Sequence, residues 1–396
     1  MRKQVAGTTG SLWILLFGNF IIGTGVLMPT GMLSEISCSF QITMATAVQL
    51  LTVSGIVIGF GAPALAYLTN KMDRRTLLTL CLLLYSVGHI ASALVSSFTL
   101  LMIIRAITVV AAAVFSPQAA ATIVLLVSPD KRDSAIAFIF TGWALAVILG
   151  VPIASFASTQ FDWEAVYLGL GTLSGLLGLG TWRLLQPRLV VAPLDFAAWK
   201  IALTHPQILA TLSVTMLSVS GQFAVFSVLS PILSAGFDAT PEQIPLAFVS
   251  AGIGGIVGSA LASVAVGRFG NDTTSIVALL SLVVGIAVFA LSFGNFSLGL
   301  LAILIWGLGS FSVTSLQQSR LVRIAPKLAS ATISLNTSAL YLGQAIGVLI
   351  GSMSIQGTVS PLTAWLALPF VCGALIISMA IPYFSRTDAE NSRNSF

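Results

Sequence analysis

The stretch GWALAVILGVPIAS at residues 142–155 returns in altered form as ALYLGQAIGVLIGS at residues 339–352, so the two copies lie 197 residues apart (339 − 142 = 197). Residues four apart lie on one face of a helix, and small residues there let helices approach closely in lipid. The pattern therefore predicts two apolar helices that pack through small faces. These faces are Gly142, Ala146, Gly150 and Ala154 in the first copy and Ala339, Gly343, Gly347 and Gly351 in the second.

The same shift aligns glycines, prolines and loop residues elsewhere, which indicates a duplicated chain. Examples are Ser37 with Ser234, Phe40 with Phe237, Gly55 with Gly252, Gly61 with Gly258 and Pro129 with Pro326. We therefore expect an N-terminal bundle at 1–185, a cytoplasmic linker at 186–207, and a C-terminal bundle with a short cytoplasmic tail at 208–396. Parallel repeats of this kind are related by an axis along the membrane normal and bind substrate between them near mid-membrane.

The composition requires a membrane protein. Apolar residues make up 57% of the chain and charged residues only 7%, whereas a soluble domain carries about 25% charged residues. In lipid the backbone must satisfy its own hydrogen bonds, so stretches of about 20 apolar residues are expected to be helices. The sequence predicts an all-α membrane protein in which twelve transmembrane helices form two six-helix bundles related by pseudo-two-fold symmetry. The expected spans are 11–33, 46–68, 76–96, 99–123, 135–158, 164–185, 208–233, 244–266, 273–293, 297–318, 329–354 and 361–384.

Basic residues predict the orientation. All of the 17 Lys and Arg residues except Arg105 fall in the two tails and the even-numbered connections between the predicted spans. Because cytoplasmic loops carry the excess of basic residues, both termini are expected in the cytoplasm, with the chain in a bacterial cytoplasmic (inner) membrane. The lipid bilayer is thus an expected partner, and a nucleic acid is not. We expect a monomer.

The sequence carries no pattern typical of an enzyme. The three cysteines are far apart and show no metal-ligand spacing, and we see no nucleophile and base pair and no phosphate-binding glycine loop. No metal, cofactor or catalytic residue is expected. A membrane receptor or enzyme remains a remote alternative.

Three stretches resemble the major facilitator superfamily, specifically its drug:proton antiporter-type efflux branch, which includes arabinose-efflux and chloramphenicol-efflux-like transporters. They are the loop GAPALAYLTNKMDRR at 61–75, the stretch at 142–155, which is similar to the branch's antiporter motif, and LQQSRLVRIAPKLASATISLNTSALYLGQAIGVLIGS at 316–352. The resemblance implies a secondary transporter that works by alternating access, with a role in multidrug resistance. It assigns packing at the antiporter motif to Gly142, Gly150, Pro152, Gly343, Gly347 and Gly351.

The resemblance also implies a cytoplasmic gate loop, with two departures from the family motif. Asn70 stands where the family has an acid that acts on a helix terminus of the opposite half, and Asp73 stands where it has a glycine. Either Asn70 caps a helix without charge, or Asp73 substitutes for the acid from three residues further on. Alternatively, the basic residues are ordinary positive-inside residues. The gate-loop candidates are Gly61, Asn70, Lys71, Asp73, Arg74 and Arg75.

All 12 acidic residues fall in predicted loops, tails or helix ends, so no carboxylate is expected at mid-membrane. Proton antiporters and exporters of organic cations commonly use such a buried acid. The proton-coupling candidates are therefore His89 and Arg105. The alternatives are a hydrogen-bonded interior histidine and an arginine that extends to the outer surface.

Polar residues on the predicted spans are candidates for substrate binding, although each could equally tie two helices together. They are Asn19, Thr24, Arg105, Gln222, Trp306, Ser310, Asn336, Tyr341 and Gln344. The sequence thus predicts a transporter that exports a small amphipathic or polar molecule of the drug or sugar class by proton antiport. A proton-independent facilitator or an uptake transporter for a neutral or anionic solute is the alternative.

Overall fold

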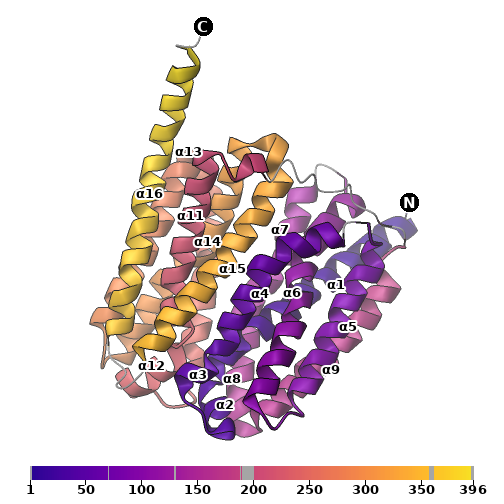
Figure 1. Ribbon diagram of the computed structural model, residues 1–396, viewed down its shortest axis with the longest axis vertical. Coiled ribbons are helices and arrows are strands. Elements are labelled where there is room, and N and C mark those ends of the chain that lie inside the picture. The colour runs from indigo at the N-terminus through magenta and orange to yellow at the C-terminus, as the bar shows by residue number, and fades with distance from the viewer. Residues whose placement is uncertain are drawn as a thin grey trace. The chain divides into compact units, whose positions relative to one another are not determined.

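The computed structural model describes residues 2–69, 71–128, 131–187, 189, 200–355 and 361–393, and each regular element among them is a helix. The helices divide into two compact units, Met1–Leu194 with Ala239–Val249 and Asp195–Asp238 with Ser250–Phe396. Figure 1 shows the order of the elements in each unit. Much of the predicted linker 186–207 lies outside the described residues, so its limits stay a prediction.

The first unit is built from helices that alternate in direction. Its elements are α1 (Arg2–Leu27), the 3₁₀ helix η1 (Met28–Gly31), α2 (Leu33–Phe40), α3 (Met44–Ala47), α4 (Gln49–Leu68), α5 (Arg74–Ser92), α6 (Phe98–Leu126), α7 (Arg132–Leu145), the π-helical turn η3 (Ala146–Gly150), α8 (Val151–Gln160) and α9 (Trp163–Leu184).

Prolines explain where two of these helices change geometry. α1 ends at Leu27, and Pro29 lies in the 3₁₀ turn that follows. The expected span 135–158 is not a uniform α-helix, because η3 separates α7 from α8 just before Pro152. A proline has no backbone N–H and clashes with the preceding turn, so each one interrupts the α-helical hydrogen bonds before it.

The second unit repeats this plan. Its elements are α11 (Pro206–Phe226), α12 (Leu229–Gly236), most of α13 (Ile244–Leu291), α14 (Phe296–Ile324), η4 (Pro326–Leu328), α15 (Ala329–Ser354) and α16 (Leu362–Arg393). The last helix runs well past its neighbours in this unit (Figure 1).

The helix α13 contains two predicted spans. Its 48 residues are interrupted at Gly270, where φ is 78°. At 1.5 Å per residue the element would be about 70 Å long, more than twice the roughly 30 Å of a bilayer core. Eleven helices among the described residues are long and apolar enough to cross a membrane, and α13, counted once, accounts for two crossings. The twelve-helix prediction is confirmed.

Several helices end away from the predicted boundaries. Span 10 was expected to end at 318, but α14 continues to Ile324, so Arg320 and Arg323 lie in the helix and not in a loop. Span 7 was expected to end at 233, but α11 ends at Phe226, and α16 continues beyond 384 to Arg393.

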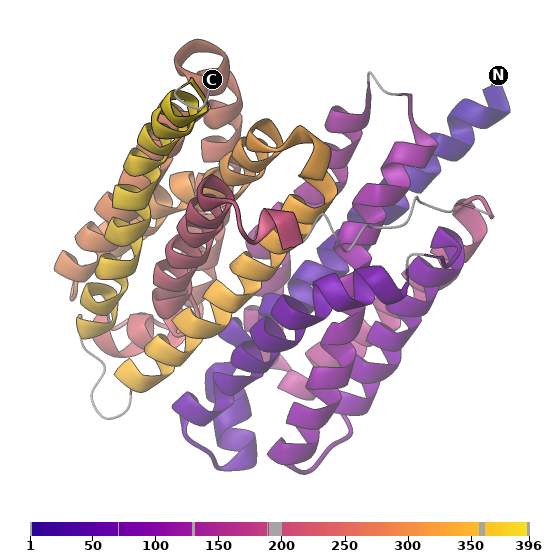
Figure 2. The same cartoon turned by 45° about the horizontal axis from the view of Figure 1, so that its top comes forward.

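The small-residue faces pack in the same way in both units. α1 lies against α7 and η3, and α11 lies against α15, as Figure 2 also shows. A methyl group added at Gly142 would lie 2.8 Å from the backbone nitrogen of Phe20, and one added at Gly347 would lie 2.9 Å from that of Ala224. Both distances are shorter than a carbon–nitrogen contact allows, so only glycine permits these helices to approach so closely.

Candidate functional site

Arg105 on α6 holds the broken end of α1. The side chain is 1% exposed, and its guanidinium donates three hydrogen bonds, from Nε to Ser54 Oγ at 2.9 Å, from Nη1 to the Gly25 carbonyl at 2.6 Å and from Nη2 to the Val26 carbonyl at 2.8 Å. The Gly25 carbonyl would normally accept from the N–H four residues later, but Pro29 has none. Carbonyls at a helix C-terminus also carry partial negative charge, which favours a cation. Arg105 is therefore a buried cap and does not extend toward the outer surface.

His89 and Tyr85 on α5 lie on the other side of the same turn. Tyr85 Oη donates to the Ile22 carbonyl at 2.9 Å, and His89 Nδ1 lies 2.8 Å from the Tyr85 carbonyl. Because a carbonyl only accepts, Nδ1 carries the proton, and Nε2 of the neutral ring is the acceptor. Within the described part of the chain Nε2 has no hydrogen-bond partner, although it is buried. It lies 2.8 Å from the place where a side chain at Gly25 would begin, so Gly25 separates it from Arg105.

Aromatic rings of α9 cover His89. The Tyr167 ring centre lies 5.5 Å from that of His89, and Trp163 packs edge-on against Tyr167 at 5.3 Å. Tyr167 Oη and Trp163 Nε1 are also buried without a hydrogen-bond partner among the described residues. The groups that can carry charge around His89 are thus Tyr85, Tyr167 and Arg105.

Asn19 ties α1 to α6 and α7. Its Nδ2 donates to the Ile139 carbonyl at 3.1 Å, and its Oδ1 accepts from Ser116 Oγ at 2.7 Å. Trp143 Nε1 in turn donates to Ser116 Oγ at 3.2 Å. With both ends of its amide engaged, Asn19 serves to hold these helices together in this structure.

The second unit places Asn336 where the repeat has Ile139 (336 − 139 = 197). Thr215 Oγ1 on α11 donates to Asn336 Oδ1 at 2.6 Å, which repeats the link between α1 and α7. Here, however, only the oxygen of the Asn336 amide has a hydrogen-bond partner. Asn336 Nδ2 is buried and lacks a partner among the residues that the structure describes.

Two more candidates of this unit present unpaired N–H donors. Trp306 Nε1 on α14 and Gln344 Nε2 on α15 are buried without a hydrogen-bond partner in the described residues. Trp306 packs edge-on against Phe226 of α11, with the ring centres 6.2 Å apart. An unpaired buried donor costs roughly 1–3 kcal/mol, so each of these N–H groups is a candidate to donate to a ligand.

The positions of the remaining substrate candidates give weaker evidence for a binding site. Gln222 Nε2 donates to the Ser218 carbonyl and Ser310 Oγ to the Trp306 carbonyl, both within their own helix at 3.2 Å. Tyr341 is buried. Thr24, in the first unit, packs against Gly150 of η3, and its hydroxyl has no partner among the described side chains and backbone.

The predicted gate loop is only partly described. Asn70 lies outside the described residues, so its capping role is an untested expectation. Gly61 lies inside α4, and Lys71 is exposed. Arg74 is buried and donates from Nη1 to the Thr69 carbonyl at 3.2 Å. Asp73 caps α5, and Arg75 stacks on the Trp182 ring at 3.9 Å.

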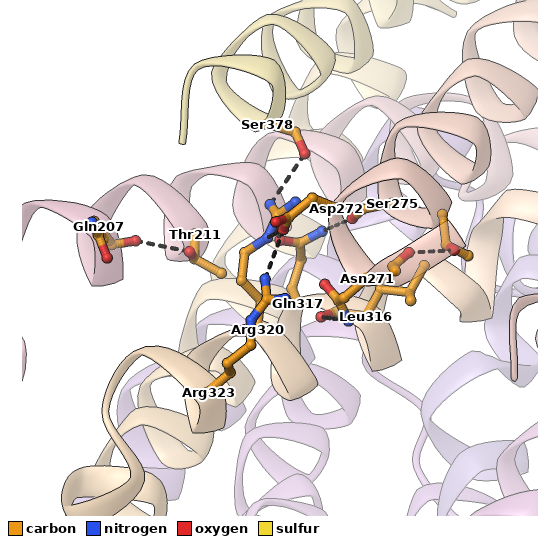
Figure 3. A network of polar contacts seen from close by, with 12 residues as sticks. Gln207, Thr211, Asn271, Asp272, Ser275, Leu316, Gln317, Arg320, Arg323 and Ser378 are labelled. Carbon is orange, nitrogen blue, oxygen red and sulfur yellow. Dashed lines mark hydrogen bonds and ion pairs between the residues drawn. The ribbon is translucent and has the colours of Figure 1, made fainter. Parts of the chain in front are cut away.

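A buried arginine in the second unit escaped the sequence analysis. Arg320 is fully buried and donates to Asp272 Oδ1 at 3.1 Å, to Gln317 Oε1 at 3.0 Å and to Ser378 Oγ of α16 at 3.1 Å. Figure 3 shows these side chains converging from three helices. Arg323 joins the same Asp272 oxygen at 2.8 Å but is largely exposed.

Two signals in the sequence could have indicated this cluster. Asp272 lies two residues after the break in α13 at Gly270. Arg320 lies three residues after Gln317, which puts these two side chains on one helical face. The positive-inside count treated Arg320 as a loop charge and so missed its burial.

Within the described residues no three His, Cys, Asp or Glu side chains lie close enough together to hold a metal ion. Each unit instead carries buried, mostly uncharged polar groups on its helices. An all-helical, duplicated, multi-pass fold of this kind is typical of membrane transporters.

The chain belongs to the Major Facilitator Superfamily, whose family model matches residues 15–348 and 211–396. It is 27% identical over 372 residues to the inner membrane transport protein YdhP of Escherichia coli K12, covering 93% of this chain and 94% of that one. It is 26% identical over 346 residues to a probable sugar efflux transporter of Helicobacter pylori G27, covering 87% and 88%. A D-xylose-proton symporter has the same fold, with a TM-score of 0.75 at 15% identity over 94% of this chain and 97% of that one.

The superfamily prediction is thus confirmed, and with it a transporter that binds a small molecule and is not an enzyme. The drug:proton antiporter branch stays a prediction.

Proposed function

We propose that this chain exports a small, uncharged solute rich in hydrogen-bond acceptors, of the sugar class, across the cytoplasmic membrane. The observation that carries the proposal is that Trp306 Nε1, Asn336 Nδ2 and Gln344 Nε2 are buried and find no hydrogen-bond partner in the part of the chain that the structure describes. Hydroxyl and ring oxygens of a sugar would accept from these groups and recover roughly 1–3 kcal/mol for each donor that is now unpaired.

The charges argue against an organic cation. Asp272, which forms ion pairs with α14, is already shared by Arg320 and Arg323. A cation in a low-dielectric site needs a carboxylate of its own. Drugs of the cationic class are therefore the less favoured substrates, and the name of the Helicobacter relative agrees with the sugar class.

His89 is the proposed proton acceptor. A proton on Nε2 would add a second positive charge on the far side of Gly25 from the Arg105 guanidinium, and like charges in a low-dielectric interior repel each other. Proton binding would thus favour a conformation in which Arg105 leaves the Gly25 and Val26 carbonyls. A ligand shifts a conformational equilibrium only through such differential affinity.

A proton-independent facilitator is the second candidate, favoured by the burial of His89 close to the charged Arg105, which opposes a second positive charge there. In both cases we propose a monomer that alternates access between its two repeats, with both termini in the cytoplasm and basic loops on that side.

Transport by everted membrane vesicles tests the proposal. We expect energised vesicles to accumulate radiolabelled neutral sugars and to leave a quaternary ammonium compound outside. Accumulation of the cation alone would refute the substrate class. If collapse of the proton gradient leaves accumulation unchanged, proton antiport is wrong, and counterflow without any gradient would then support the facilitator. The matched variant His89→Gln, which cannot titrate, should keep counterflow and lose accumulation.

A further inference from the structure

The loop between α4 and α5 holds one residue of the segment that leaves α9. Leu189 lies five residues after the end of α9 at Leu184 (189 − 184 = 5). Its N–H donates to Asp73 Oδ1 at 2.8 Å, and its carbonyl accepts from the Arg74 N–H at 2.9 Å. Both backbone groups of Leu189 are therefore fixed to the start of α5.

Asp73 can do this because it has two acceptor oxygens. While Oδ1 accepts from Leu189, Oδ2 accepts from the N–H and the hydroxyl of Thr76, both at 3.1 Å, and so caps α5. The stacking of Arg75 on Trp182 adds a second contact between the start of α5 and the end of α9. The two oxygens of Asp73 thus face different partners, Oδ2 the start of α5 and Oδ1 the backbone of Leu189.

The second repeat lacks a carboxylate at the position of Asp73. The position that corresponds to Asp73 is Gly270 (73 + 197 = 270), which has no side chain and a φ of 78°. The carboxylate is thus an asymmetric addition to the first repeat, on the side from which the chain passes to the second. Both oxygens of Asp73 accept hydrogen bonds from groups of the first unit.

We propose that Asp73 is a positioning residue that anchors the exit of the inter-repeat linker to the N-terminal unit. The chain up to Leu189 then moves with α5 and α9. The anchor stands independently of the substrate, whereas any effect of the anchor on export rests on the proposed function.

Limited trypsin digestion of the purified full chain tests this anchor, since trypsin cleaves after Arg188 and after Lys200. Cleavage before Leu189 requires that residue to leave its partners, so the rate follows the open population. Asp73→Ser keeps a capping oxygen but is too short to reach Leu189. Loss of one hydrogen bond to a charged group should speed cleavage after Arg188 about tenfold, with cleavage after Lys200 unchanged as an internal reference.

Thr76→Val is the matched control, because it loses a bond to Oδ2 and leaves the Leu189 bond intact. It should digest like the unaltered chain. The proposal is overturned if Asp73→Ser leaves the Arg188 rate unchanged, or if Thr76→Val raises it equally. Slower export by Asp73→Ser with unchanged digestion would also overturn it and favour action on the other repeat. Because digestion needs no substrate, a failure of the proposed export leaves this test intact.

Discussion

Replacement of Arg105 by lysine tests whether α1 depends on the forked guanidinium or only on a positive charge. The guanidinium spans three acceptors on α1 and α4. A lysine ammonium is a single nitrogen and cannot reach all three, so about two hydrogen bonds to a charged group are lost. At roughly 1.5–3 kcal/mol each, Arg105→Lys should lower stability by about 3 kcal/mol or more.

The assay is thermal unfolding in detergent, read together with export in vesicles. We expect the midpoint to fall by several degrees and export to drop strongly, because Pro29 cannot supply the N–H that the Gly25 carbonyl would accept from in a continuous helix. Ser54→Ala, which removes one neutral acceptor, is the control and should cost about 1 kcal/mol. If Arg105→Lys matches the unaltered chain in both measurements, the capping role is wrong, since a lysine can extend to the surface as well as an arginine.

Two further predictions concern packing and buried charge. Asp272→Ala leaves the guanidinium of Arg320 buried without its carboxylate and should lower the free energy of unfolding by about 3 kcal/mol. Arg323→Ala removes an exposed partner and should lower it by less than about 1 kcal/mol. Equal shifts of the two variants in thermal unfolding would contradict this prediction. Gly142→Ala would push against the backbone of α1 and should lower the unfolding midpoint and export, while Gly169→Ala, with no atom within 4 Å of the added methyl among the described residues, should be neutral. A larger loss of stability in Gly169→Ala than in Gly142→Ala would show that the small residues of α7 do not determine how closely it packs against α1.

The sequence predicted the fold because its signals were local or periodic. Span lengths, the small residues at every fourth position and the 197-residue shift each depend on the order of residues alone. The limits of α14 were misjudged because a buried arginine looks like a loop charge until its partners on α13 and α16 are known.

The candidate site was only partly accessible to sequence reasoning. Arg105 was found as an unusual charge, but its partners are backbone carbonyls, which no side-chain pattern reveals. The Gly25 to Pro29 spacing is the signal that marks a carbonyl without its helical donor. Asn19 and Asn336 looked alike in the sequence, yet one amide is fully paired and the other is not, a difference that depends on the neighbouring helix.

Accumulation in everted vesicles that contain the Asn336→Leu variant tests the central claim most directly. The variant removes an unpaired donor and retains a similar volume, with Thr215→Val as the control for the lost contact to Asn336 Oδ1. We predict that accumulation of a neutral sugar falls at least about tenfold in Asn336→Leu, as expected for a lost donor to a buried acceptor, and changes little in Thr215→Val. Undiminished sugar accumulation by Asn336→Leu would contradict the account.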